Sequence, residues 1–331
     1  MKRLAALLVA LIGVLLLTPN LNAYLKIGFD VGGTVVGIRW PNGVQYFVTN
    51  RDVPGVPAAE LRGAIERAFS TWTNTGSSAV VSEFAGFVNA EPGVDDGVSA
   101  IGFVPLDEDT VLGETSFLID EMTGEIVESD IVLNSSFSWS VAAGGETGRH
   151  DVESIVLHEV GHMLGLGHSA LGETELLDTD RRRLIGKGAV MFPIAFPAGN
   201  IADRMLATDD IAGVSDIYPT SGVNRETGSV VGRVRSGGRG VFGAHVVGYN
   251  ISTGTMNATF SLSAEGNFVL SGLRPGVYVI RVEPLDDASI DSFFDTDAAV
   301  DADFRAVFSP QLAVVPAGGR GSDIDIEVEP K

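Results

Sequence analysis

The stretch that decides the fold is HEVGHMLGLGH, residues 158–168. On an α-helix His158 and His162 are one turn apart, so both imidazole rings project from the same face. Gly165 can adopt a positive φ without a Cβ penalty, so the helix can end there and the chain can turn back. That turn can bring His168 to the same point. We therefore expect these three histidines to bind one metal ion.

Three imidazole nitrogens suit Zn²⁺ and leave a fourth position open for water, which is the arrangement of a catalytic site. Glu159 is placed to take a proton from that water as it attacks a carbonyl. The alternative is that these are ordinary histidines of a core helix. The chain has only 5 histidines, however, and three of them stand at ligand spacing. His150 precedes the helix without partners at ligand spacing, and we expect a helix-entry or surface residue. His245 lies in a strand of the C-terminal part, and we likewise expect it at the surface.

Helical patterns cover residues 57–74, 151–164 and 208–218. The first has Pro57 in its first turn, the second opens with the capping residue Asp151, and the third opens with Thr208 as a cap. β-rich runs lie between the first two helices, at residues 45–49, 80–84, 99–103, 115–119 and 125–133. These patterns predict an α/β or α+β domain with three helices up to about Pro219.

The pattern changes after residues 220–227, which we interpret as a linker. Alternating runs then occur at residues 230–235, 241–249, 259–262, 268–270, 277–282, 306–315 and 324–328. Short strands at this spacing predict an all-β sandwich domain over residues 228–331. The Asp-rich stretch 286–303 lacks a regular calcium-loop pattern, so we interpret it as a solvated loop, with a calcium loop as the alternative.

Composition excludes several classes of function. Asp and Glu number 43 against 22 Lys and Arg, which gives a formal net charge of −21. Such a surface repels phosphate backbones and anionic lipid, so we expect neither nucleic acid nor a membrane surface as a partner. Cysteine is absent, which excludes disulfides, thiolate metal ligands and Cys nucleophiles.

Residues 1–23 have the features of a signal peptide. Lys2 and Arg3 form a basic start, an apolar run covers residues 4–17, and Ala23 stands where signal peptidase cuts. The apolar run is shorter than the roughly 20 residues of a membrane-spanning helix, which disfavours an uncleaved anchor. We expect a secreted protein that begins near Tyr24 and has no membrane span after signal removal.

The zinc motif resembles that of the metzincin metalloproteases, and Ser169 after the third histidine is similar to the matrixin branch. AVMFP at 189–193 resembles the Met-turn of the family, and TDDIAGV at 208–214 resembles the start of the matrixin C-terminal helix. RWP at 39–41 and AFSTW at 68–72 resemble the first strand and first helix. The resemblance covers residues 39–219 and implies an α+β catalytic domain with a mixed sheet and three helices.

This resemblance implies a zinc endopeptidase in which His158, His162 and His168 bind the metal and Glu159 is the general base. It further implies that Met191 lies beneath the zinc and that Pro193 forms a wall of the pocket for the residue after the cleaved bond. Substrate would lie extended along an edge strand, for which residues 112–119 are our candidate.

Three departures from the family pattern matter. The chain has no cysteine, so latency by a Cys–zinc bond is impossible. No histidine lies between Tyr24 and Arg149, so the ligands of a second, structural zinc are missing and we predict one zinc. The link from His168 to Met191 is longer than in the family and contains residues 176–183 with three consecutive arginines. We interpret that segment as a solvated loop, with a processing site or a specificity loop as alternatives.

Residues 228–331 resemble carboxypeptidase-regulatory-like or transthyretin-like sandwiches, on GRV at 232–234, VFGAHV at 241–246 and GNFVLSGLRPGVY at 266–278. Such a fold does not reveal a ligand. We therefore predict a secreted zinc endopeptidase that acts on proteins or peptides, with calcium sites left open. The alternatives are a zinc hydrolase of another substrate and a non-catalytic adhesion or extracellular-matrix-binding protein. In the latter the sandwich would be the functional module and Glu159 would not be needed.

Overall fold

The structure is a computed structural model, and it describes residues 26–31, 34–177, 182–294 and 298–331. The predicted signal peptide at residues 1–23 lies outside the described residues. Within the described ranges, no helix combines the length and the apolar character needed to cross a bilayer.

A mixed five-stranded sheet organises the N-terminal part, residues 26–219. Its strands are β3 (Val44–Thr49), β4 (Ser82–Val88), β5 (Ala100–Val104), β6 (Gly113–Ile119) and β7 (Ile126–Asn134). Their order is β4-β3-β5-β7-β6, with β6 antiparallel to β7 and the other pairs parallel. All five predicted runs are strands, and the proposed substrate strand at 112–119 corresponds to the edge strand β6.

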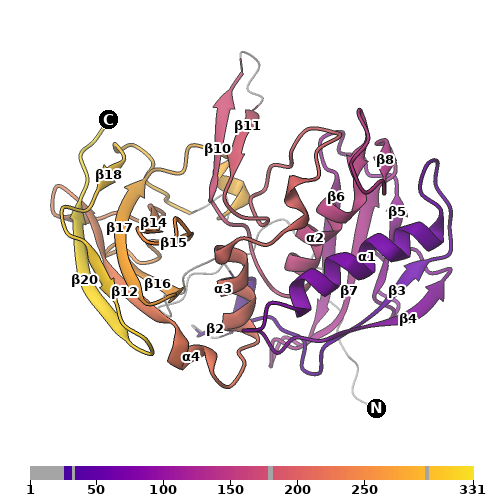
Figure 1. The fold of residues 1–331 in the computed structure, drawn as a ribbon, viewed down its shortest axis with the longest axis horizontal. Coiled ribbons are helices and arrows are strands. Elements are labelled where there is room, and N and C mark those ends of the chain that lie inside the picture. The colour runs from indigo at the N-terminus through magenta and orange to yellow at the C-terminus, as the bar shows by residue number, and fades with distance from the viewer. Residues whose placement is uncertain (1–25, 32–33, 178–181, 295–297) are drawn as a thin grey trace.

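Three α-helices accompany this sheet: α1 (Ala58–Thr73), α2 (Val152–Met163) and α3 (Thr208–Ile217). Helices α1 and α2 pack against each other and against the sheet (Figure 1). The ring of Phe69 on α1 stacks on Tyr46 of β3, with 4.1 Å between centroids. The indole of Trp72 donates a hydrogen bond of 2.8 Å to the Leu157 carbonyl, which ties α1 to the helix that carries the zinc motif.

The helix starts differ from prediction in two places. Asp151 caps α2 as predicted, since its side chain accepts the Ser154 N–H at 2.9 Å. Pro57 stands at the N-cap of α1 rather than in its first turn. The cap of α3 is Ala207 rather than Thr208, because Asp210 already accepts the otherwise free Ala207 N–H at 2.8 Å.

Short elements complete the N-terminal part: β1 (Gly28–Val31), β2 (Thr34–Gly37), β8 (Trp139–Ser140), β9 (His150–Asp151), β10 (Gly172–Leu176), β11 (Arg182–Lys187) and the 3₁₀ turn η1 (Ala202–Arg204). Strands β10 and β11 pair as an antiparallel hairpin that projects from the molecule (Figure 1). In the described residues of 176–183 the expected exposure is found, since Leu176 is 60% exposed, but the expected loop is wrong because Leu176, Arg182 and Arg183 belong to strands. Leu176 and Arg182 are paired across the hairpin.

The C-terminal part, residues 220–331, contains two sheets. One contains β12 (Gly228–Ser236), β13 (Arg239–Gly240), β16 (Asn267–Leu273) and β20 (Arg320–Glu327). The other contains β14 (His245–Asn250), β15 (Met256–Phe260), β17 (Gly276–Glu283), β18 (Val307–Phe308) and β19 (Ala313–Val315). The predicted run 306–315 is divided between β18 and β19, and the linker contains a short helix, α4 (Val223–Glu226). The turn η2 (Ile290–Ser292) follows β17.

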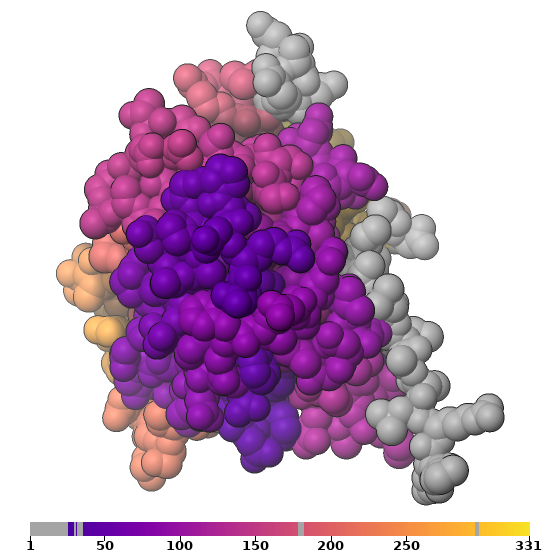
Figure 2. All heavy atoms as spheres, turned by 90° about the vertical axis from the view of Figure 1, so that its right-hand side faces the viewer, coloured from indigo at the N-terminus to yellow at the C-terminus, as the bar shows by residue number. Residues whose placement is uncertain are grey.

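The two parts are joined at the start of α3. The Thr208 hydroxyl donates to the Met256 carbonyl at 2.6 Å, and the Ala258 N–H donates to the Asp209 carboxylate at 2.8 Å. The largest buried cluster contains side chains from both parts. Figure 2 looks onto the end opposite the C-terminal sheets, where N-terminal residues cover nearly the whole face and orange residues show only at the rim. The division into independent domains at 220–227 stays a prediction.

Candidate metal centre

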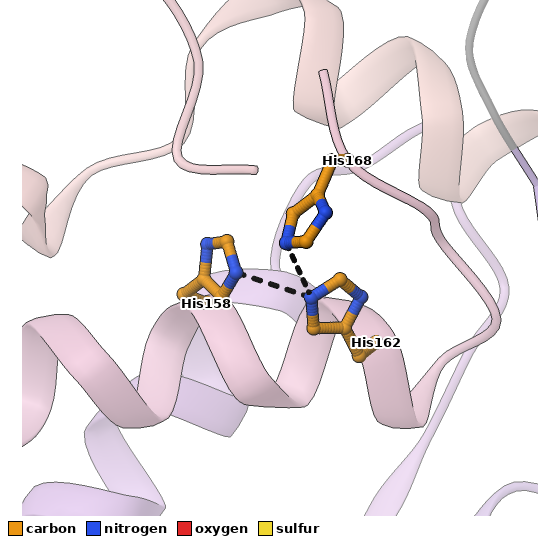
Figure 3. A group of neighbouring side chains, drawn as sticks. All are labelled: His158, His162 and His168. Atoms are coloured by element: carbon orange, nitrogen blue, oxygen red, sulfur yellow. Dashed lines mark hydrogen bonds between the residues drawn. The ribbon is translucent and has the colours of Figure 1, made fainter. Parts of the chain in front are cut away.

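Three histidine rings converge as predicted, two from α2 and one from the chain that follows it (Figure 3). The Nε2 atom of His162 lies 3.1 Å from Nε2 of His158 and 3.2 Å from Nε2 of His168. In a tetrahedral zinc site with Zn–N distances of about 2.0–2.1 Å, ligand nitrogens stand roughly 3.3 Å apart. The spacing of these nitrogens therefore fits a small tetrahedral cation.

Each ring is oriented through its other nitrogen by a backbone carbonyl. Nδ1 of His158 lies 2.8 Å from the Val190 oxygen, and Nδ1 of His162 lies 2.8 Å from the Leu166 oxygen. Nδ1 of His168 lies 2.7 Å from the oxygen of Ser292. A carbonyl only accepts, so every Nδ1 carries the proton and every Nε2 of a neutral ring presents a lone pair. Three lone pairs aimed at one point repel unless a cation lies among them.

The environment keeps the rings neutral. Burial lowers the pKa of His162 to about 3 and that of His168 to about 4, with neighbouring positive charge acting in the same direction. Burial also lowers the pKa of His158 well below its usual value. Neutral imidazoles are the form that binds zinc. The donor set, its spacing and its protonation all fit Zn²⁺.

The turn that brings in the third ligand depends on Gly165, as predicted. Its φ is 95°, which L side chains rarely adopt, and an added Cβ would lie 2.7 Å from the Ile38 oxygen. The Gly165 N–H donates to the His162 carbonyl at 2.6 Å and closes the helix end. The next carbonyl, of Leu166, is the one that orients His162.

Glu159 is buried and lies against the edge strand β6. The Thr115 hydroxyl donates to its Oε2 atom at 2.8 Å. Its Oε1 atom lies against Gly113, where an added Cβ would approach to 2.8 Å. Burial raises the pKa of Glu159 to about 7, although the hydrogen bond from Thr115 acts in the opposite direction. A carboxyl group with such a pKa is suited to accept and release a proton near neutral pH.

Met191 packs beneath α2 at the helix turn between the first two ligands. A Cβ at Gly161 would overlap the Met191 sulfur and lie 2.9 Å from the Trp72 ring. Gly161 therefore allows the helix to approach both side chains, a reason for glycine that the motif alone did not give. Val190, which precedes Met191, supplies the carbonyl for His158.

Two buried carboxylates, Asp209 and Asp210, support the site, although the sequence pattern indicated no such role for them. Asp210 accepts the N–H groups of Val190 at 2.9 Å and Met191 at 3.1 Å, which fixes the turn beneath the histidines. Asp209 accepts the Ser169 hydroxyl at 2.7 Å and thereby holds the chain after the third ligand. Two acidic residues in a first helical turn are explained by the dipole alone, so no sequence signal pointed to these partners.

The structure places Pro193, His150 and His245 in three different environments. Pro193 is half-buried two residues after Met191, and its role as a pocket wall stays a prediction. His150 is half-buried against the Phe137 ring at the entry to α2. His245 lies in a strand, β14, as expected, but the expectation that it is a surface residue is wrong, since it is 2% exposed and bonds Glu283 at 2.9 Å. Burial tends to raise the pKa of Glu283, but the hydrogen bond and charge of His245, together with Arg281, hold it below its usual value.

The solvated loop expected at residues 286–303 is confirmed only in part where the stretch is described: Asp286, Asp291, Asp301 and Asp303 are exposed, but the segment also forms a turn and buries two rings. Ile290–Ser292 form the turn η2, and Phe293 and Phe294 behind it are 1% and 2% exposed. The prediction considered only the Asp content of this stretch, whereas its aromatic pair drives burial against Phe192 and Phe260.

Comparison with known proteins gives one family match. Residues 39–219 match the family described as Matrixin. Metalloendoproteinase 4-MMP of Arabidopsis thaliana is 26% identical over 178 residues, which are 51% of this chain and 43% of that protein. Metalloendoproteinase 1-MMP of Arabidopsis thaliana is 30% identical over 171 residues, 48% of this chain and 38% of that protein. Metalloendoproteinase 1 of Glycine max is 29% identical over 175 residues, 48% of this chain and 45% of that protein. The matches thus span less than half the length of these relatives.

Proposed function

The chain belongs to the matrixin family, and on that premise we propose that it is a zinc-dependent endopeptidase that hydrolyses peptide bonds in proteins. The observation that carries the proposal is the convergence of three neutral imidazoles beside one buried carboxyl group, Glu159. A binding protein would need neither the open ligand set nor that carboxyl group.

Zn²⁺ held by His158, His162 and His168 would supply Lewis-acid chemistry toward a water molecule and the scissile carbonyl. Glu159 then acts as the base. Because Thr115 occupies its Oε2 atom, Oε1 is the atom that takes the proton from the attacking water. The same carboxyl group returns that proton to the leaving amine.

The substrate lies extended along β6. This strand is at the sheet edge, where unpaired backbone groups can add a peptide as a further strand. Gly113 on that strand lies against Glu159, so the absence of a side chain there leaves backbone close to the base. Pro193, by family resemblance, forms a wall of the pocket for the residue after the cleaved bond.

Secretion and the role of the C-terminal part complete the proposal. The basic start and apolar run within residues 1–23 support export through a signal peptide. The two sheets of residues 228–331 support a β-sandwich that binds or spaces partners outside the cleft. One zinc is the proposed cofactor, and the question of calcium sites stays open.

The experiment is casein hydrolysis by the purified protein, with and without 1,10-phenanthroline. We expect the chelator to abolish cleavage and stoichiometric Zn²⁺ to restore it. Cleavage that persists in protein stripped of zinc would overturn the proposal.

A further inference from the structure

The third metal ligand, His168, is oriented by a backbone carbonyl of the C-terminal part. Nδ1 of His168 donates to the carbonyl oxygen of Ser292 across 2.7 Å and 124 residues of sequence. The carbonyls that orient His158 and His162 belong to Val190 and Leu166, both in the N-terminal part. His168 alone among the three depends on the C-terminal part.

The segment that carries this carbonyl, residues 286–294, is firmly held, and we call it the clamp segment. On the inner side Phe293 is 1% exposed, and its ring stands edge-on to His168 with 6.4 Å between centroids. Within the turn, the N–H groups of Phe293 and Phe294 both donate to the Ile290 oxygen, at 2.9 and 3.0 Å. The Ser292 carbonyl is therefore fixed by the turn that precedes it and by the buried rings that follow it.

A second anchor ties the clamp segment to the hairpin that follows the zinc motif. The Thr174 N–H donates to Oδ1 of Asp287 at 2.6 Å, and the Thr174 hydroxyl donates to the Asp287 carbonyl at 2.7 Å. The Arg182 guanidinium donates to the Asp286 carbonyl on the same edge. The hairpin, an insertion relative to the family pattern, thus holds the clamp segment beside His168.

We propose that the Ser292 carbonyl is the positioning group of the third zinc ligand, so that the C-terminal part completes the metal centre. An acceptor on Nδ1 fixes the tautomer and the ring orientation and makes the other nitrogen a better ligand. The inference rests on the proposed zinc site and goes beyond the proposed function. It assigns the C-terminal part a role in metal retention, in addition to any binding outside the cleft.

The test weakens that one carbonyl in the full chain. Phe293 is replaced by its α-hydroxy acid, phenyllactic acid, which converts the Ser292–Phe293 amide into an ester with a poorer carbonyl acceptor. The matched control places the same residue at Phe294. Each ester removes one N–H donor to Ile290, but only the first changes the acceptor of His168.

Zinc affinity is measured by competition with a chromogenic chelator, independently of peptidase activity. We expect the ester at position 293 to weaken zinc binding by about 10-fold or more relative to the ester at 294, the range for loss of an outer hydrogen bond to a ligand. In ¹⁵N-histidine NMR of the zinc-loaded protein, the Nδ1 proton of His168 should shift while those of His158 and His162 stay in place. Equal zinc affinities of the two esters, within twofold, would overturn the proposal.

A side-chain series tests the same inference if the esters do not fold. Asp287→Ala removes the acceptor of the Thr174 N–H, and Asp287→Asn keeps an oxygen there. Asp286→Ala removes the same charge but leaves the hairpin anchor, since its side chain bonds only Lys331 among the described contacts. We expect weaker zinc binding in Asp287→Ala alone. Equal zinc affinity in all three variants would contradict the proposal. Full zinc affinity of the unsubstituted protein without peptidase activity would contradict only the proposed function.

Discussion

The Asp210 carboxylate accepts the backbone N–H of Met191 at 3.1 Å, which ties Met191, packed against Gly161 of α2, to the first turn of α3. The same carboxylate accepts the N–H groups of Val190 and Ala207. Asp210 is 2% exposed, so none of these donors has water as a ready substitute. The carboxylate therefore links the backbone at Val190 and Met191, the orientation of His158 and the start of α3.

Replacing Asp210 with Ala should lower the free energy of unfolding by about 2–3 kcal/mol, because buried N–H groups lose a charged acceptor. Urea denaturation measures the change. Asp216→Ala is the control on the same helix, since its ion pair with Lys26 is partly exposed and should contribute at most about 1 kcal/mol. Equal losses in the two variants would show that Asp210 does not hold the turn.

Gly161→Ala should destabilise the protein although alanine is the better helix former. The added methyl group would overlap Met191 and crowd Trp72, and overpacking of this kind costs about 1–3 kcal/mol. Gly63→Ala in α1 is the matched control, because its added Cβ meets only the Arg67 side chain at 3.5 Å. That control should gain about 0.5–1 kcal/mol. Thermal denaturation of both variants decides the matter, and a gain in both would contradict the packing described.

Stability should depend on pH through Asp130. Burial raises its pKa to about 6, against the hydrogen bonds from Ala100, Gly93 and Val94. The pKa of Asp130 is higher in the folded state than the value of about 3.9 in the unfolded chain, so protonation favours the folded state. This stabilisation is fully present below the unfolded pKa and is lost as the pH rises through the folded pKa. We expect a loss of stability between about pH 4 and 6 that is reduced in Asp130→Asn. The urea midpoint of unfolding is measured at several pH values for the parent and for Asp130→Asn. The same pH dependence of the midpoint in both proteins would refute this prediction.

The sequence predicted the histidine cluster, which depends on local spacing. It did not predict the hydrogen bonds between residues that are far apart in the sequence. Only eleven residues separate the first from the last of the three histidines, counting both, at positions 158, 162 and 168. Helical periodicity and one glycine are therefore enough to bring them together. Asp209 accepts a hydrogen bond from Ala258, which is 49 residues away in the sequence. His168 is bonded to the backbone oxygen of Ser292, and a backbone acceptor leaves no recognisable residue type in the sequence. His245 gains its partner Glu283 only when β14 pairs with β17.

The central claim is that three histidines hold zinc while Glu159 moves the proton, and Glu159→Gln separates these roles. The amide keeps the shape of the side chain but cannot take the proton of the attacking water. Elemental analysis should find near-stoichiometric zinc in the variant, as in the parent, while His162→Ala should lose the metal. Peptide turnover by zinc-loaded Glu159→Gln should fall by at least about 10², the scale of a lost general base. Turnover at the parent rate in that variant would contradict the account.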